Sequence, residues 1–417
     1  MFLADDLRYD MVGFTGNRIV HTPNLNALAR EGLVFSRCFA PAPLCPCSRA
    51  SILTGQYTMR HGVTSYSTPL AYAVLGSTYP VLMRAEGYFT GLIGKWGVGN
   101  ERSAAKQFDF WEGFYERSRY YTGRDSQRMH LNDEQRGHIL RFLKNVPGRP
   151  FLLMVHFKAP HEPLTPQPEF AALYESVTVP PVPTNTREAL DALPPMLKDT
   201  YFANRGRRYR NHERFQRDMR RYLALVSGMD AVIGDTIAAL KAGGQYANTL
   251  IIFTSDNGLL LGEHRLRGKH VMYEEAIRIP LLMRLPIGAA VTADPSRLNR
   301  LVLNMDLAPT ILDIAGIEVP AGIQGVSLMT LLKGTARWRS EFPLINHRDA
   351  VYPTSRGIRT TRWKYVEYLP SEGRPQRQLF DLRADPHEEH NLVHSKQFAA
   401  IRSDLRTRMH LLLDEHG

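Results

Sequence analysis

The stretch with the clearest capacity for chemistry is residues 44–57, Leu-Cys-Pro-Cys-Ser-Arg-Ala-Ser-Ile-Leu-Thr-Gly-Gln-Tyr. Cys45 and Cys47 stand just before a short helix that the pattern predicts over 48–53, which a Thr-Gly pair then ends. A side chain at a helix N-terminus meets free N–H groups and the positive end of the helix dipole, and Arg49 adds a cation one turn in. Such a pocket suits a nucleophile that acts on an anionic ester. The alternative interpretation is a pair of buried structural cysteines.

A second group of candidate residues offers oxygen ligands only. Asp5 and Asp6 follow one short apolar run, and Asp256 and Asn257 follow another. Oxygen ligands select hard cations, calcium or magnesium, over zinc. Asp5-Asp6 alone would be explained as a loop start or a helix cap. Because a second pair of oxygen ligands, Asp256-Asn257, follows another apolar run, the sequence favours a metal site.

Two further polar residues, Lys95 and His161, also follow predicted strands. Ligands of open α/β sheets bind beyond the carboxyl ends of the strands, so these residues and the oxygen ligands should converge there. His161 stands in a proline-flanked loop directly after a strand, which is not a typical core position. The alternative is a structural histidine whose ring nitrogens are hydrogen-bonded within the core.

The rest of the sequence predicts the elements that position these residues. Apolar runs predict strands at 1–4, 90–93, 151–157, 250–254, 280–285, 355–368 and 378–382. Amphipathic patterns with start and stop signals predict helices at 23–31, 79–86, 132–145, 215–242, 306–315 and 396–414, while residues 163–200 read as an irregular surface excursion. This alternation predicts a large doubly wound, mostly parallel α/β sheet flanked by helices over 1–336. A smaller C-terminal α+β subdomain, with an antiparallel sheet and a helix, is predicted over 337–417.

Composition favours anionic partners. The chain has 417 residues, 22% charged residues and a net charge of +11, which points to sulfated glycans, phosphate esters, nucleic acid or an acidic membrane surface. Eight arginines lie between Arg205 and Arg221. We expect this segment to border the substrate entrance rather than to bind nucleic acid; a solvated helix face is the alternative.

The three cysteines form no disulfide framework, and no apolar run predicts a membrane span. No signal peptide precedes the first strand, so the chain as written is expected to be cytoplasmic. The first strand is short, which suggests a truncated start, and a longer chain would allow a periplasmic or secreted location. Oligomeric state is not readable.

Residues 45–55 resemble the signature of the sulfatase family, Cys-x-Pro-Ser-Arg-x-x-x-Leu-Thr-Gly, except that Cys47 replaces the proline. Residues 94–97, Gly-Lys-Trp-Gly, resemble the family's Gly-Lys-Trp-His, with Gly97 in place of the histidine. The segment 264–280 and the Asp-Pro and Asn-Leu pairs within 385–392 match further family stretches. The resemblance implies an alkaline-phosphatase-like fold.

The resemblance also implies roles for individual residues. A maturation enzyme would oxidise Cys45 to formylglycine, whose hydrate is the nucleophile. Calcium, rather than magnesium, would be bound by Asp5, Asp6, Asp256 and Asn257 together with residue 45. The implied catalytic residues are Cys45, Arg49, Lys95, His161 and Lys269, with the two lysines on the sulfate and the histidine near the leaving-group oxygen.

The resulting expectation is a sulfuric ester hydrolase that releases sulfate from a sulfated sugar or glycan, with no nucleic-acid partner. Two alternatives remain open. One is a catalytically impaired relative that binds anionic glycans, and the other is a phosphate or phosphonate ester hydrolase on the same scaffold.

Overall fold

The computed structural model describes residues 1–123, 128–198, 200–289, 298–334, 337–347 and 352–417. Its centre is an eight-stranded sheet in the order β12-β2-β11-β8-β1-β7-β3-β4. The strands are β1 Phe2–Asp5, β2 Leu33–Phe39, β3 Phe89–Lys95, β4 Phe110–Phe114, β7 Phe151–Pro160, β8 Ile251–Ser255, β11 Arg278–Arg284 and β12 Val302–Leu303. Only β11 pairs antiparallel with its neighbours, so the predicted mostly parallel sheet is confirmed.

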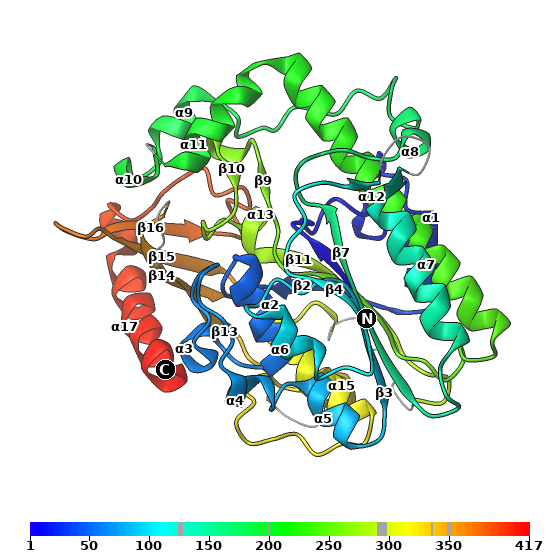
Figure 1. The fold of residues 1–417 in the computed structure, drawn as a ribbon. Coiled ribbons are helices and arrows are strands. Elements are labelled where there is room, and N and C mark those ends of the chain that lie inside the picture. The colour runs from blue at the N-terminus through cyan, green and yellow to red at the C-terminus, as the bar shows by residue number, and fades with distance from the viewer. Residues whose placement is uncertain (124–127, 199, 290–297, 335–336, 348–351) are drawn as a thin grey trace.

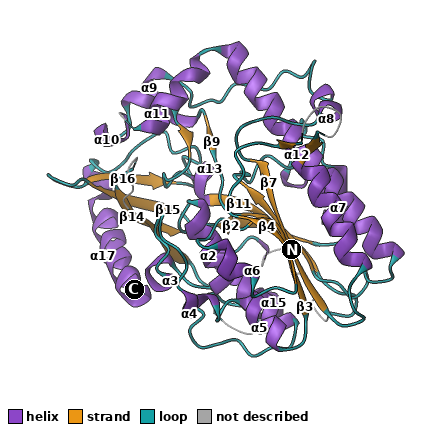
Figure 2. Cartoon of the chain, viewed as in Figure 1, coloured by secondary structure: helices purple, strands orange, loops and turns teal. Residues whose placement is uncertain are grey.

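Helices cover both faces of this sheet (Figures 1 and 2). On one face lie α1 Pro23–Arg30, α7 Leu131–Lys144 and α12 His212–Ala242; on the other lie α2 Cys45–Thr54, α5 Tyr79–Ala85, α15 Leu307–Ile314 and α16 Leu328–Lys333. The side chains of strand β1 show why helices pack on both faces of the sheet. Phe2 and Ala4 enter the core under α12, while Leu3 enters the core on the α2 side, since successive side chains of a strand point to opposite faces.

Shorter elements lie in the connections. They are α3 Thr58–His61, α4 Tyr72–Leu75, α6 Glu101–Ala105, β5 Tyr121–Thr122, β6 Met129–His130, α8 Pro168–Ala172, α9 Arg187–Asp191, α10 Pro195–Lys198, α11 Tyr201–Gly206, the 3-10 helix η3 Arg207–Arg210, β9 Leu260–Leu261, β10 Arg267–Gly268 and α13 Glu274–Ile277. Residues 163–200, predicted to be irregular, therefore contain three short helices.

The C-terminal part is a four-stranded antiparallel sheet with one helix. Its elements are β13 Glu341–Asn346, β14 Thr354–Thr360, β15 Trp363–Leu369, β16 Gln376–Asp381 and α17 Ala399–His416. One face of the sheet shares a core with the large sheet through Phe342 and Phe39, and the other packs Ile358 and Leu379 against Leu405 of α17. The predicted subdomain boundary at 336 lies outside the described residues and stays a prediction.

Several predicted bounds were wrong. Helix α2 begins at Cys45 rather than near residue 48, so Cys45 lies within its first turn. The single strand predicted over 355–368 is the hairpin β14–β15. Strands β2, β4 and β13 were not predicted; in β2 and β4 polar residues interrupt the apolar run.

Among the described helices, α12 is long and apolar enough to cross a membrane by length and composition alone. Of its most apolar 18-residue window, 67% is buried inside the protein. Leu223, Val226 and Met229 of this helix belong to the core beneath the sheet. A buried core helix passes the same test of length and composition.

Candidate active site

Two neighbouring strands bring the predicted oxygen ligands together. β1 and β8 pair in parallel, with Ala4 opposite Ser255, so the residues that follow them emerge side by side. The Asp6 N–H donates to Asp256 Oδ1 at 3.2 Å, and Asn257 Nδ2 donates to Asp6 Oδ1 at 2.6 Å. The convergence expected at the carboxyl ends of the strands is therefore present for this pair.

The first turn of α2 points at the same place. Cys45 Sγ lies 3.1 Å from Asp5 Oδ1, and the Ser48 hydroxyl donates to the Asp256 carbonyl oxygen. Gly55, at φ 65°, ends the helix in the left-handed conformation. All ten residues of α2 are buried, which fixes Cys45 against the carboxylates.

Three cations surround this cluster, each from a different element. Arg49 Nε donates to Asp256 Oδ2 at 2.8 Å, and Lys95 Nζ, at the end of β3, donates to Asp5 Oδ2 at 2.6 Å. Lys269 Nζ, directly after β10, lies 2.5 Å from Asp6 Oδ1 and 2.5 Å from Cys45 Sγ. Three buried cations thus face three buried carboxylates, which offsets the cost of burying each charge.

The electrostatics follow from burial and these pairings. Burial alone would raise the pKa of Asp5, but Lys95 and the other cations hold that pKa well below its ordinary value. Burial and the nearby Asp5 raise the pKa of Asp256 to about 6. Burial, Asp256 and Asp5 together raise the pKa of the Cys45 thiol well above its usual value. An unmodified thiol at this position therefore holds its proton.

His161 lies in the loop directly after β7, as predicted. Its Nε2 is 3.6 Å from Asp6 Oδ2, and its Nδ1 is 2.8 Å from the Glu162 carbonyl oxygen. Burial lowers the pKa of His161 to about 4 although Asp5 and Asp6 oppose the change. The imidazole is thus neutral when the cavity holds no anion.

Cys45 opens onto a cavity of about 440 Å³. Its lining residues are Cys45, Tyr66, Lys95, Gly97, Tyr115, Glu116, Ser118, Lys158, His161 and Glu162. Six of these had no part in the sequence prediction: Tyr66, Tyr115, Glu116, Ser118, Lys158 and Glu162. Lys158 and Glu162 flank His161 in sequence and could have been included on that ground. The other four lie on connections whose path no local pattern reveals.

Gly97, which stands where the motif Gly-Lys-Trp-His has its histidine, adopts φ +68°. A Cβ atom there would lie 3.2 Å from Arg49 Cδ and 3.3 Å from Lys95 Cε. Both contacts are closer than ordinary van der Waals distance, and the backbone conformation favours glycine. In this chain the two cationic side chains therefore occupy the space next to residue 97.

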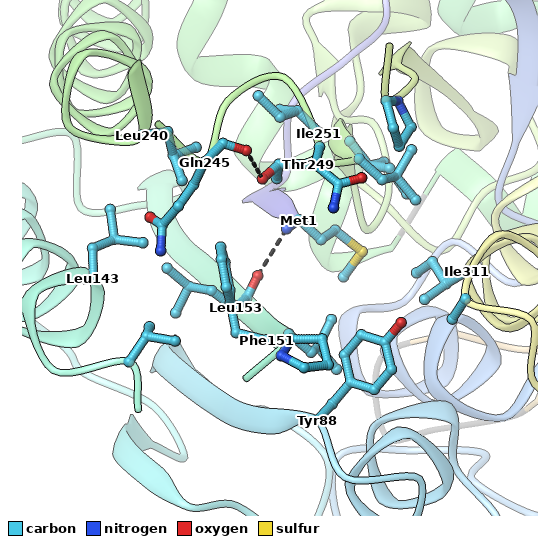
Figure 3. A pocket seen from close by; sticks show the side chains of 18 of the residues that line it. Met1, Tyr88, Leu143, Phe151, Leu153, Leu240, Gln245, Thr249, Ile251 and Ile311 are labelled. Carbon is cyan, nitrogen blue, oxygen red and sulfur yellow. Dashed lines mark hydrogen bonds between the residues drawn. The ribbon is translucent and has the colours of Figure 1, made fainter. Parts of the chain in front are cut away.

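A second cavity, of about 560 Å³, lies at the opposite end of the strands. Figure 3 shows Met1, Tyr88, Phe151 and Leu153 around it, with mostly apolar side chains. It surrounds the amino ends of β1, β7 and β8. The converging charges lie at the carboxyl ends, where open α/β sheets bind their ligands, so we assign the chemistry to the Cys45 cavity.

The donor set fits a hard divalent cation. One ligand atom each from Asp5, Asp6, Cys45 and Asp256 lies within 4.8 Å of the others. Asn257 Oδ1 is buried and has no hydrogen-bond partner among the described residues, although buried polar atoms are normally satisfied. An ion at this cluster would supply that partner.

Comparison with known proteins gives one family. Residues 1–317 match the family model described as Sulfatase, and residues 262–415 match that described as N-sulphoglucosamine sulphohydrolase, C-terminal. The chain is 29% identical to an N-acetylglucosamine-6-O-sulfatase of Bacteroides thetaiotaomicron, over 97% of this chain and 84% of that protein. It is 30% identical to a choline-sulfatase of Rhizobium meliloti, over 90% of this chain and 78% of that protein.

Solved structures also resemble this chain. One in complex with its substrate D-glucosamine-2-N,6-O-disulfate matches with a TM-score of 0.84 and 28% identity, covering 100% of this chain and 97% of the other. The phosphonate monoester hydrolase of Agrobacterium radiobacter matches with a TM-score of 0.83 at 22% identity, over 100% and 95% of the two chains, and shows the shared fold. The chain therefore belongs to the sulfatase family and is a sulfuric ester hydrolase.

Proposed function

We propose that this sulfatase removes an O-sulfate group from a sulfated sugar in the Cys45 cavity. The observation that carries the proposal is the ring of three buried cations around residue 45. Two findings support the substrate class: a curated relative is an N-acetylglucosamine-6-O-sulfatase, and a similar solved structure is in complex with a glucosamine disulfate.

The cations recognise the sulfate group. Lys95 and Lys269 are 2% and 5% exposed. Lys269 contacts Cys45 and Lys95 contacts its neighbour Asp5, so their ammonium groups can donate to sulfate oxygens as the ester enters. Arg49 is held by Asp256 and by the Lys95 carbonyl oxygen, 2.8 Å away. Fixed donors in a buried site stabilise charge that develops in the transition state without reorganising.

Residue 45 supplies the nucleophile after conversion of Cys45 to formylglycine. The aldehyde hydrate would supply one oxygen to attack sulfur as the sugar oxygen leaves, and loss of the proton from its second hydroxyl would then re-form the aldehyde and expel sulfate. Its position at the first residue of α2 gives it the free N–H groups of a helix N-terminus. Cys47 lies two residues further on and packs beside Ala42 and Leu44, so we assign the nucleophile to position 45 alone.

Asp5, Asp6, Asp256 and Asn257 would hold a calcium ion together with the oxygen at position 45. Calcium suits this set because hard cations prefer carboxylate and amide oxygens. The bound ion supplies Lewis-acid polarisation of a sulfate oxygen. These side chains keep the nucleophile oriented through their contacts with α2.

His161 is the proposed proton donor to the leaving sugar oxygen. Its side chain lines the cavity and is 25% exposed. A bound sulfate ester adds negative charge beside the ring, which favours the protonated imidazolium. Lys158, with Nζ 2.8 Å from the Glu162 carbonyl oxygen, holds the loop that carries the ring.

The test combines peptide mass and turnover after co-expression with a maturation enzyme. The peptide containing residue 45 should show the mass of the aldehyde, and the protein should release sulfate from nitrophenyl sulfate and from 6-O-sulfated glucosamine. A phenylphosphonate monoester is the competing substrate. Unmodified Cys45 without hydrolysis, or faster cleavage of the phosphonate, would overturn the proposal.

The variant His161→Ala tests whether His161 is the proton donor. Activity on the sugar sulfate, whose leaving group needs a proton, should fall by about 10²–10⁴-fold. Activity on nitrophenyl sulfate should fall much less, because nitrophenolate leaves without protonation. Equal losses on both substrates would contradict the assigned role.

A further inference from the structure

The basic segment that the sequence predicted at 205–221 forms a hollow on the surface. The hollow has a volume of about 490 Å³ and lies on η3 and the first turns of α12. We call it the arginine hollow and define it by Arg207, Arg208, Arg210, Arg214 and Arg217; Asn211 and the carboxylate residue Glu213 also line it. All except the half-buried Arg214 are exposed.

Most of this positive charge lacks a partner within the described part of the chain. Arg214 and Arg217 approach a single carboxylate, that of Asp218, at 3.9 and 3.7 Å. The three arginines of η3 pair with no carboxylate among the described residues. Guanidinium groups bind sulfate and carboxylate oxygens through two parallel hydrogen bonds, so this surface suits an external polyanion.

The hollow is joined to the wall of the catalytic cavity. Tyr209, the inward residue of η3, packs its ring 5.3 Å from the Arg267 guanidinium, and Arg267 Nη1 donates to Glu162 Oε2 at 2.8 Å. Glu162 lines the cavity. Two residues beyond Arg267, Lys269 reaches Cys45. Figure 1 shows α11 and the start of α12 above β9 and β10.

The aromatic residues in and next to the segment argue against single-stranded nucleic acid. Tyr209, Phe215 and Tyr222 are 3%, 3% and 0% exposed, because they pack into the core beneath η3 and α12. Proteins that bind single strands stack bases on exposed aromatic rings. These three rings are not available for stacking, whereas the arginines that alternate with them face outward.

We propose that the arginine hollow is a binding site for a sulfated polysaccharide. The hollow binds the anionic groups of sugars that neighbour, along the polymer, the sugar whose sulfate group occupies the catalytic cavity. The proposal rests on the sugar-sulfatase function proposed above and extends it from a single sulfated sugar to a polymer. It also explains why the excess of arginine is gathered on η3 and the first turns of α12.

The test replaces the three η3 arginines together, as Arg207→Gln, Arg208→Gln and Arg210→Gln. A matched control replaces three exposed arginines elsewhere, Arg30, Arg300 and Arg383, so that both variants lose the same charge. Heparin is the polyanion probe, measured by binding and by salt elution. Double-stranded DNA is the competing probe, and nitrophenyl sulfate reports on the catalytic cavity.

We expect the hollow variant to bind heparin about tenfold more weakly, from a factor of about two for each exposed ion contact. The control should bind as the wild type does, and both variants should keep nitrophenyl sulfate turnover. Equal weakening in the two variants, or tighter binding of DNA than of heparin, would overturn the proposal. Loss of nitrophenyl sulfate turnover in the wild type with intact heparin binding would instead refute the catalytic proposal.

Discussion

Glu116 is an acidic residue inside a cavity proposed to bind an anion, and we predict that Glu116→Gln strengthens sulfate binding. Its Oε2 lies 2.7 Å from Lys95 Nζ, and its Oε1 lies 3.3 Å from Lys158 Nζ. Burial alone would raise the pKa of Glu116, but the nearby Lys95 lowers it. The carboxylate is therefore charged at neutral pH. An entering sulfate must share Lys95 with this carboxylate.

The magnitude follows from Coulomb repulsion. A sulfate oxygen bound to Lys95 would lie about 5 Å from the Glu116 carboxylate, which gives about 3 kcal/mol at an effective dielectric constant of 20 and about 1 kcal/mol in water. The Glu116 side chain is 38% exposed. Solvent screening therefore favours the lower end, about 1–2 kcal/mol, which is a gain of about five- to thirtyfold in affinity.

The assay is calorimetric binding of inorganic sulfate at constant ionic strength. Placing Glu116→Gln in a Cys45→Ala background makes the result independent of maturation. Glu112→Gln is the matched control, because Glu112 is also partly exposed at 34% and ion-paired, in its case with Arg141. Weaker sulfate binding in Glu116→Gln would refute the reasoning, since it would mean that Glu116 positions Lys95 rather than competing for it.

Three further predictions test the site and the C-terminal sheet. Cys45→Ala should abolish release of nitrophenol from nitrophenyl sulfate, whereas Cys47→Ala should keep measurable activity; inactivity of both would contradict the assignment. Calcium at a hundredfold excess over its Kd should stabilise the wild type by about 2.7 kcal/mol in thermal melts, and Asp256→Ala should remove the effect; an unchanged calcium response in Asp256→Ala would exclude this cluster. Burial alone would raise the pKa of Glu367, but hydrogen bonds from Arg356 and other residues lower that pKa from 4.5 to about 2. Its stabilising contribution is therefore complete above about pH 4.5 and lost as the pH falls to about 2. Glu367→Gln should lower the free energy of unfolding by about 1–2 kcal/mol at pH 7, allowing for partial solvent screening, and denaturant melts of the two proteins should converge near pH 2; a constant difference between pH 7 and pH 2 would count against this.

The central strands could be predicted from the sequence because their environment is uniform. β7 and β8 are covered on both faces, so nearly every side chain is apolar and the run stands out. β2 was missed for the opposite reason. Only Phe35, Cys38 and Phe39 of its seven residues are buried, and the half-buried Ser36 and Arg37 lie in the middle of the strand.

The same distinction applies to the site. Asp5, Asp6, Asp256 and Asn257 could be predicted as neighbours because parallel strands place their carboxyl ends at one edge. The position of His161 at this edge was predicted from the same rule. Lys269 was identified only through a family resemblance, since the short strand before it, β10, lies outside the central sheet.

The sequence alone determined the sheet type and the residues at its active edge, because strand hydrophobicity and strand ends are local features. Only the tertiary structure decided that Glu116 shares Lys95 with the incoming anion and that Gly97 lies against Arg49. It also decided that η3 contacts the cavity wall through Tyr209, Arg267 and Glu162. These contacts join segments far apart in the chain. Their geometry depends on how loops pack over the sheet, which no periodic pattern encodes.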